Sequence, residues 1–176
     1  MSQRPGLWVL QAPTGSIQEQ YTFGKKLGEG GYGYAQLCTH IQSGEVRAVK
    51  VLPKRIVTQA QCDSMREEYE FMRSLDHPNI IKAFDAFETV ENFYMVMEYC
   101  AGGELFARIT EKKRYSERDA AAVMTQILEG IGYLHDNKIA HCDLKPDNFL
   151  FMTADEDAKL KIIDFGMSKR NILSYK

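Results

Sequence analysis

The chain has 176 residues, of which 44% are hydrophobic and 26% charged, and its 22 basic and 24 acidic side chains leave a formal net charge of −2. This is the composition of a globular protein with its own core, so wholesale disorder and a collagen-like chain are excluded. The near balance of charge gives no basis for binding nucleic acid or an anionic membrane surface, so any phosphate binding has to be local.

The N-terminal residues and the cysteines indicate in which cellular compartment the protein is expected. Residues 1–20 contain prolines and glycines with little periodicity and are predicted to form a flexible leader. The apolar run Leu7–Leu10 is too short for a membrane anchor. The cysteines are widely spaced, with no C-x-x-C pair and no zinc-binding spacing, which predicts reduced thiols in a cytoplasmic protein, with the nucleus as the alternative; they are Cys38, Cys62, Cys100 and Cys142.

Short strand-like runs dominate the first half of the chain after the leader. They alternate apolar and polar residues and are separated by glycine-rich or polar turns, so we expect an antiparallel sheet of five strands. The predicted strands are 21–27, 34–40, 45–51, 80–88 and 92–98.

Helical patterns interrupt these strands once and then take over. A helix over 59–75 is predicted before the stop at His77 and Pro78, and another over 105–112. Ser116 and Asp119 have the spacing of a capping box at the start of a helix that runs to about Asn137. Two short apolar runs, 149–152 and 160–163, follow this helix.

The glycine-rich segment 28–33 matches the pattern G-x-G-x-x-G at Gly28, Gly30 and Gly33. The pattern also marks dinucleotide-binding folds, but those need a helix directly after the third glycine, and here strands are predicted on both sides. Glycines that join two strands can lie close over an anion and offer N–H groups to it. An ordinary glycine turn remains the alternative. The sequence contains no P-loop string.

Lys50 lies in the apolar run of the third predicted strand and needs an explanation. On the first long helix, a rotation of about 100° per residue places Glu68 on the same face as the apolar residues Met65 and Met72. A buried carboxylate without a cation is costly, so Glu68 is expected to pair with Lys50. An exposed lysine at a sheet edge is the alternative.

The segment 141–148, His-Cys-Asp-Leu-Lys-Pro-Asp-Asn, gathers acid, base and amide side chains. The adjacent Cys142 and His141 lack the mutual geometry of a Cys–His nucleophile pair. The pattern instead suits phosphoryl transfer, in which Asp143 accepts a hydroxyl proton, Lys145 neutralises the moving phosphoryl group and Asn148 offers an oxygen to Mg²⁺. Asp164, in the triplet Asp-Phe-Gly, supplies a second metal-binding oxygen ligand.

Taken in this order, the motifs resemble the catalytic domain of the eukaryotic serine/threonine protein kinases over residues 21 to about 170. Lys145 in Asp-Leu-Lys-Pro is similar to the serine/threonine rather than the tyrosine kinases. The stretches 77–81 and 95–106 are most similar to the calcium/calmodulin-dependent and calcium-dependent kinase group. The resemblance implies an α+β fold, with a five-stranded small lobe carrying one helix over 21–98 and the first part of a mainly helical large lobe over 99–176.

The resemblance also implies roles for individual residues. The cofactors would be ATP and Mg²⁺, with Asn148 and Asp164 holding the metal and Asp143 as catalytic base. Lys50 would contact the α- and β-phosphates and pair with Glu68. Further residues would bind the nucleotide, with Met97 as gatekeeper and Glu104 placed for the ribose or for an arginine of the substrate; they are Leu27, Gly28, Gly30, Gly33, Ala35, Ala48, Met97, Glu98, Cys100 and Glu104.

Three features depart from the kinase pattern. Cys142 replaces the usual arginine before the catalytic aspartate and cannot form a bidentate phosphate clamp, and Ala35 replaces a valine under the adenine. The chain also ends at Lys176, soon after Asp164, before the activation segment and later helices of a whole kinase. We therefore expect a truncated kinase that binds ATP but transfers phosphate weakly in isolation.

Two alternatives to this expectation stay open, a non-catalytic ATP-binding scaffold and an incomplete gene model with no folded product of its own. The expected partners are proteins with serine or threonine acceptors, with basic motifs as one option, and neither nucleic acid nor a membrane anchor is expected. Regulation by a calcium sensor is expected if a longer form exists.

Overall fold

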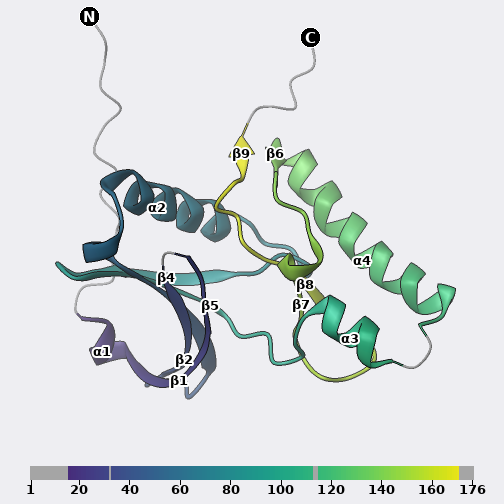
Figure 1. Cartoon of the computed structure of the whole chain (residues 1–176), viewed down its shortest axis with the longest axis horizontal. Coiled ribbons are helices and arrows are strands. Elements are labelled where there is room, and N and C mark those ends of the chain that lie inside the picture. The colour runs from purple at the N-terminus through teal and green to yellow at the C-terminus, as the bar shows by residue number, and fades with distance from the viewer. Residues whose placement is uncertain (1–15, 32, 113–114, 171–176) are drawn as a thin grey trace, which may run out of the picture. The chain divides into compact units, whose positions relative to one another are not determined.

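The computed structural model describes residues 16–31, 33–112 and 115–170 (Figure 1). The chain divides into two compact units, which we call unit 1 (residues 1–66 and 84–97) and unit 2 (residues 67–83 and 98–176). The boundary passes through helix α2 (Gln59–Arg73). The expected division into lobes at residue 98 stays a prediction.

The strands of unit 1 form the predicted antiparallel sheet of five, in the order β1-β2-β3-β5-β4. The hairpin of β1 and β2 pairs Glu29 with Tyr34, and β2 pairs with β3 from Tyr34 opposite Val51 to Thr39 opposite Val46. The strands are β1 (Tyr21–Glu29), β2 (Tyr34–His40), β3 (Val46–Pro53), β4 (Ala83–Glu88) and β5 (Asn92–Glu98), with a 3₁₀ turn η1 (Lys54–Ile56) after β3.

The predicted leader was wrong at its C-terminal end. Residues 17–20 form a short helix, α1 (Ile17–Gln20), and Ile17 is fully buried among the side chains of the sheet. Burial of this large apolar side chain stabilises α1. The prediction relied on the prolines and glycines nearby, which carry no information about this burial. Residues 1–15 of the expected leader lie outside the described residues.

The core of unit 1 lies against the side of the sheet that receives Ile17. Tyr21 begins β1 inside this core, and its hydroxyl donates to Asp85 while accepting from Arg47 at 2.6 Å. The guanidinium of Arg47 also stacks on Phe84, 3.9 Å from the ring centroid. The core cluster consists of Ile17, Tyr21, Cys38, Val49, Val51, Phe87, Tyr94 and Val96, with Tyr34 at its margin.

Helix α2 has the amphipathic face that the sequence predicts. Met65, Met72 and Leu75, just after the helix, are buried, and Glu68 is only 5% exposed on the same face. Within unit 1, Arg66 is held by Glu88 of β4, which also accepts from Lys54 at 2.6 Å.

The fourth strand starts later than predicted, at Ala83 rather than at residue 80. Ile80 forms an isolated bridge with Ile162, and the N–H of Ile81 donates to the Ile162 carbonyl at 3.0 Å. The apolar side chains at 80 and 81 therefore belong to the core of unit 2, although their sequence pattern continues that of the strand.

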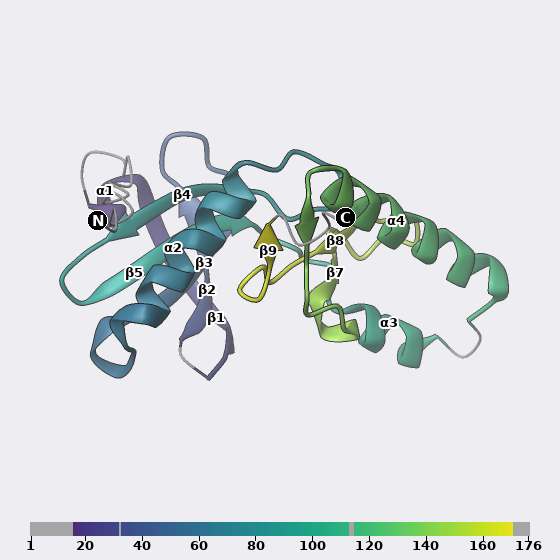
Figure 2. The same ribbon diagram turned by 90° about the horizontal axis from the view of Figure 1, so that it is seen from above.

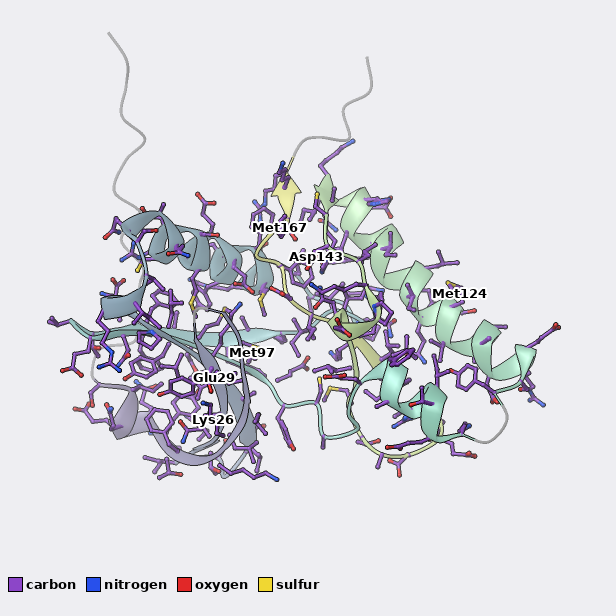
Figure 3. The ribbon with its side chains drawn as sticks, viewed as in Figure 1. Lys26, Glu29, Met97, Met124, Asp143 and Met167 are labelled. Atoms are coloured by element: carbon purple, nitrogen blue, oxygen red, sulfur yellow. The ribbon has the colours of Figure 1, made fainter. Side chains whose placement is uncertain are left out.

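The helices of unit 2 are α3 (Leu105–Glu111) and α4 (Glu117–Asp136), shown in Figure 2. The capping box of Ser116 and Asp119 is confirmed, because each side chain bonds the backbone N–H of the other. Ile127 and Leu134 are buried, whereas Met124 and Leu128 are 51% and 59% exposed. Figure 3 shows Met124 on the outward side of α4.

Two small antiparallel ladders complete unit 2. The predicted apolar runs form β7 (Phe149–Phe151) and β8 (Leu160–Ile162), which pair with each other. The second ladder was not predicted and joins β6 (Ile139–Ala140) to β9 (Lys169–Arg170) (Figure 1). Across the described ranges, no helix combines the length and apolar character needed to cross a bilayer.

Candidate active site

The glycine-rich segment lies at the tip of the β1–β2 hairpin, as predicted. Gly28 is opposite Ala35, and Ala35 is in turn opposite Lys50 on β3. Directly opposed residues of an antiparallel sheet share a face, so Ala35 and Lys50 project from the same side, in one row with Gly28. The register thus brings the glycine-rich turn and the predicted phosphate-binding lysine together within unit 1.

The third glycine of the motif is required by close packing. A Cβ at Gly33 would lie 2.2 Å from the Val51 carbonyl oxygen, closer than any real contact. Gly33 also accepts a hydrogen bond from the Gly30 N–H at 2.8 Å, which closes the turn. Lys26 pairs with Glu29 of the same strand at 2.6 Å, with both side chains exposed; Figure 3 labels both residues.

The other predicted nucleotide-binding residues of unit 1 lie on the strands around this row. Ala48 is buried two residues before Lys50 and therefore on the same face of β3. Leu27, at an irregularity of the β1–β2 register, is 38% exposed, and Met97 is partly buried at the end of β5. Lys50 and Glu68 belong to different units, so their pairing stays a prediction.

The loop after β6 brings together two predicted catalytic residues of unit 2, Asp143 and Lys145, and the predicted metal ligand Asn148. Lys145 donates from Nζ to Asp143 Oδ2 at 2.8 Å, and Asn148 Nδ2 donates to the same oxygen at 3.1 Å. Asn148 Nδ2 also donates to the Asp143 backbone carbonyl at 2.8 Å. The carboxylate is thus held from two sides, and Figure 3 shows Asp143 in the loop next to β6.

These contacts set the ionisation of the aspartate. The hydrogen bond from Lys145 is the largest influence and lowers the pKa of Asp143 below its usual range, with a smaller contribution from Asn148. The same bond raises the pKa of Lys145. Asp143 is therefore ionised at neutral pH and able to accept a proton.

His141 fixes the backbone that leads into this loop. The ring is buried, its Nε2 donates to the Ile163 carbonyl at 3.0 Å, and its Nδ1 accepts from the Asp143 N–H at 3.3 Å. The ring also packs on Phe165, with 4.9 Å between centroids. One imidazole thus connects the catalytic loop to the segment that carries Asp164.

Asp164 lies near Glu68, the buried glutamate of α2. A Cβ placed on Gly166 would be 3.5 Å from Asp164 Oδ1 and 3.8 Å from Glu68 Oε2, so both carboxylates approach this one glycine. Asp164 also has a left-handed backbone, with φ of 62°, as does Cys142, with φ of 64°. Such angles are uncommon outside glycine and concentrate at functional sites.

The residues predicted to hold Mg²⁺ provide suitable ligands. Both hydrogen bonds of the Asn148 amide use its nitrogen, which leaves the amide oxygen as the atom able to bind a cation. Asn148 and Asp164 are brought close by the Ile163 N–H, which donates to the Asn148 carbonyl at 3.0 Å. Amide and carboxylate oxygens are the hard ligands that Mg²⁺ prefers.

The predicted adenine-binding residues Glu98 and Cys100 lie at the end of β5 and just after it. The Glu98 N–H donates to the Lys82 carbonyl at 3.0 Å, and the Lys82 N–H donates to the Glu98 side-chain Oε2 at 3.1 Å. Burial is the main cause that raises the pKa of the Cys100 thiol to about 12, and the charge of Glu98 adds to it. Cys100 is therefore a neutral thiol at physiological pH.

Glu104 forms an isolated antiparallel bridge with Leu150 and lines a surface cavity of about 380 Å³. The cavity lies between α3 and the turn after β7, and Arg108 closes one side by donating to the Thr153 carbonyl at 2.7 Å. Glu104 is exposed there and precedes the first residue of α3.

One buried charge next to the site was missed by sequence reasoning. Lys161 lies in the middle of β8, is 6% exposed, and pairs with Glu98 at 2.7 Å. The signal was the same as for Lys50, a lysine within an apolar strand. The partner could not be found, because Glu98 lies far away along the sequence.

Comparison with known proteins identifies the family. Residues 21–175 match the model of the protein kinase domain. The chain belongs to the protein kinase family. The serine/threonine kinase resemblance and the α+β kinase fold are thereby confirmed.

Similar kinases include calcium-regulated proteins of plants and animals. The chain is 42% identical over 163 residues to calcium-dependent protein kinase 12 of Arabidopsis thaliana, covering 92% of this chain and 33% of that protein. It is 40% identical over 159 residues to calcium/calmodulin-dependent protein kinase type 1 of Caenorhabditis elegans, covering 90% and 45%. This kinase chain therefore spans between a third and a half of the length of these relatives.

Proposed function

We propose that this chain binds Mg·ATP and that its protein transfers the γ-phosphoryl group to serine or threonine hydroxyls of other proteins. The observation that carries the proposal is the Asp143 carboxylate, which accepts hydrogen bonds from Lys145 and Asn148. A base held in this way needs no rearrangement before it accepts a hydroxyl proton.

In the proposed reaction the acceptor hydroxyl transfers its proton to Asp143 while its oxygen bonds to the γ-phosphorus. The bond from that phosphorus to the bridging oxygen of ADP breaks, and Lys145 compensates charge on the transferred group. Asn148 and Asp164 would hold Mg²⁺, which when bound neutralises charge on the phosphate oxygens. Gly28, Gly30 and Gly33 would cover the phosphates, and Lys50 would contact them.

Nucleotide binding is tested by thermal-shift titration with Mg·ATP. We expect a concentration-dependent rise in melting temperature for the wild-type chain, and a loss of most of that rise in Lys50→Ala. Lys25→Ala is a matched control, because Lys25 is an exposed lysine elsewhere in the same sheet. A wild-type chain whose melting temperature does not respond to Mg·ATP would contradict the proposal.

Phosphoryl transfer is tested with radiolabelled ATP and a basic peptide that contains one serine. We expect slow transfer, and a further fall of at least about 100-fold in Asp143→Asn, since a positioned base contributes on this order. Asp143→Asn should still bind Mg·ATP. Binding without any transfer would instead support the non-catalytic scaffold alternative.

We also propose that, if a longer form of the protein exists, phosphorylation by that full-length form responds to calcium. The support is the similarity to calcium-dependent and calcium/calmodulin-dependent kinases. The test compares peptide phosphorylation by the full-length protein in Ca²⁺ and in a calcium chelator, with calmodulin added in a parallel set. Equal rates under all these conditions would contradict calcium control.

A further inference from the structure

Lys161 is a charged side chain in the interior of unit 2. It lies in the middle of β8, and its side chain is 8% exposed. Its ammonium group contacts Glu98 Oε2 at 2.7 Å and donates to the Ile80 carbonyl at 3.1 Å. The proposed phosphoryl transfer gives this residue no role.

The contacts of Lys161 join three separate segments. Glu98 Oε2 also accepts from the Lys82 N–H at 3.1 Å, and the Glu98 N–H donates back to the Lys82 carbonyl at 3.0 Å. Ile81 donates to the Ile162 carbonyl next to Lys161 at 3.0 Å. The ammonium thus lies where residues 80–82, the end of β5 and β8 meet.

The backbone after Glu98 forms its next hydrogen bonds three residues later, at Ala101. The N–H groups of Ala101 and Gly102 donate to the carbonyls of Met152 and Phe151, both at 2.9 Å. Cys100 lies between the two attachments. The backbone of 98–100 therefore has its position set at one end by the β7–β8 hairpin and at the other by the contacts of Glu98.

Fold stability alone does not explain a largely buried ion pair at this place, with side chains 8% and 20% exposed. Removing two charges from water costs free energy that their attraction often fails to repay, and apolar side chains of similar size are frequently as stable. Removing only one partner is different, because the other charge is then left buried and unpaired. A buried pair is best attested where it fixes one arrangement among several.

We propose that Lys161 is a positioning residue that sets the backbone of residues 98–100 for adenine recognition. This inference rests on the proposed binding of Mg·ATP. Without the ammonium, the Glu98 side chain loses its anchor on β8, and the backbone groups of the segment lose their fixed position. Base selectivity should then fall, while contacts to the triphosphate remain.

The test measures dissociation constants of Mg·ATP and Mg·ITP, which differ in the groups on the Watson–Crick edge of the base. The main variant is Lys161→Met combined with Glu98→Gln, which removes both charges and keeps an oxygen able to accept from Lys82. Lys161→Met alone leaves the Glu98 carboxylate without its cation and is expected to unfold more easily. Lys159→Met is the matched control, because Lys159 is an exposed lysine on the same hairpin.

We expect the double variant to bind Mg·ATP at least fivefold more weakly with little change for Mg·ITP, so that the ratio of the two constants falls by a similar factor. Circular dichroism should show it folded, and the control should match wild type. A folded double variant with a wild-type ratio would overturn the inference. So would a double variant that fails to fold, because the pair would then be structural. Wild-type protein that binds neither nucleotide would refute the proposed function itself.

Discussion

Gly102 follows the predicted adenine-binding segment and lies directly against the β7–β8 hairpin. A Cβ at this position would be 1.9 Å from the Thr153 carbonyl oxygen and 2.8 Å from the Phe151 Cβ. The nearest obstacle is backbone rather than the end of a flexible side chain. In Gly102→Ala the segment must therefore move away from the hairpin by more than an ångström.

The loss of stability in Gly102→Ala follows from the hydrogen bonds that this movement breaks. The N–H groups of Ala101 and Gly102 each donate to the hairpin at 2.9 Å, and a lost hydrogen bond of this kind costs about 1 kcal/mol net. Overpacking adds about 1–3 kcal/mol in well-packed sites. With both bonds lost, we expect Gly102→Ala to destabilise unit 2 by roughly 3–5 kcal/mol in total.

Native-state hydrogen exchange measures this change where it occurs. Protection of the amides at 101 and 102 should fall by roughly 100- to 4000-fold, since each 1.4 kcal/mol is a factor of ten. Gly132→Ala is the control, because nothing lies within 4 Å of a Cβ there, and helix propensity predicts a gain of about 1 kcal/mol. Wild-type protection in Gly102→Ala, or equal effects of the two substitutions, would refute the reasoning.

Three further predictions concern ionisation, backbone strain and thiol reactivity. Lys145→Met removes the main cause of the lowered pKa of Asp143, so that pKa should rise toward its ordinary range in a carbon-13 NMR titration; an unchanged value would contradict the contact. Lys138, after α4, has a φ of 61°, a conformation that strains a residue with a Cβ but not glycine. Lys138→Gly should therefore raise the free energy of unfolding, measured in urea, by about 1 kcal/mol. A lower free energy of unfolding would contradict the strain. Cys142 is exposed, whereas burial raises the pKa of the Cys100 thiol to about 12. With iodoacetamide at pH 8, mass spectrometry should therefore find Cys142 modified well before Cys100. The reverse order would contradict the burial of Cys100.

Local sequence patterns were sufficient for most of the elements. The capping box at Ser116 and the buried face of α2 depend on residues three or four positions apart, and both were predicted correctly. The five strands of the sheet were found because alternation and turns are local signals. The predictions were wrong where a contact with a residue far away along the sequence determines the local structure. Ile80 belongs with Ile162 rather than with β4, and Ile17 is ordered by the core that it enters.

The candidate site shows the same division. Its residues were found from the order of short motifs, since each motif carries the side chains of one chemical task within a few positions. The sequence also determined the family and the residue types available for phosphate, metal and proton transfer. Tertiary structure alone decided that Lys145 and Asn148 both bond the Asp143 carboxylate, that Glu68 and Asp164 approach one glycine, and that Lys161 is buried against Glu98. Such contacts join residues whose spacing along the chain carries no signal, and burial, which makes them energetically important, exists only once the chain has folded.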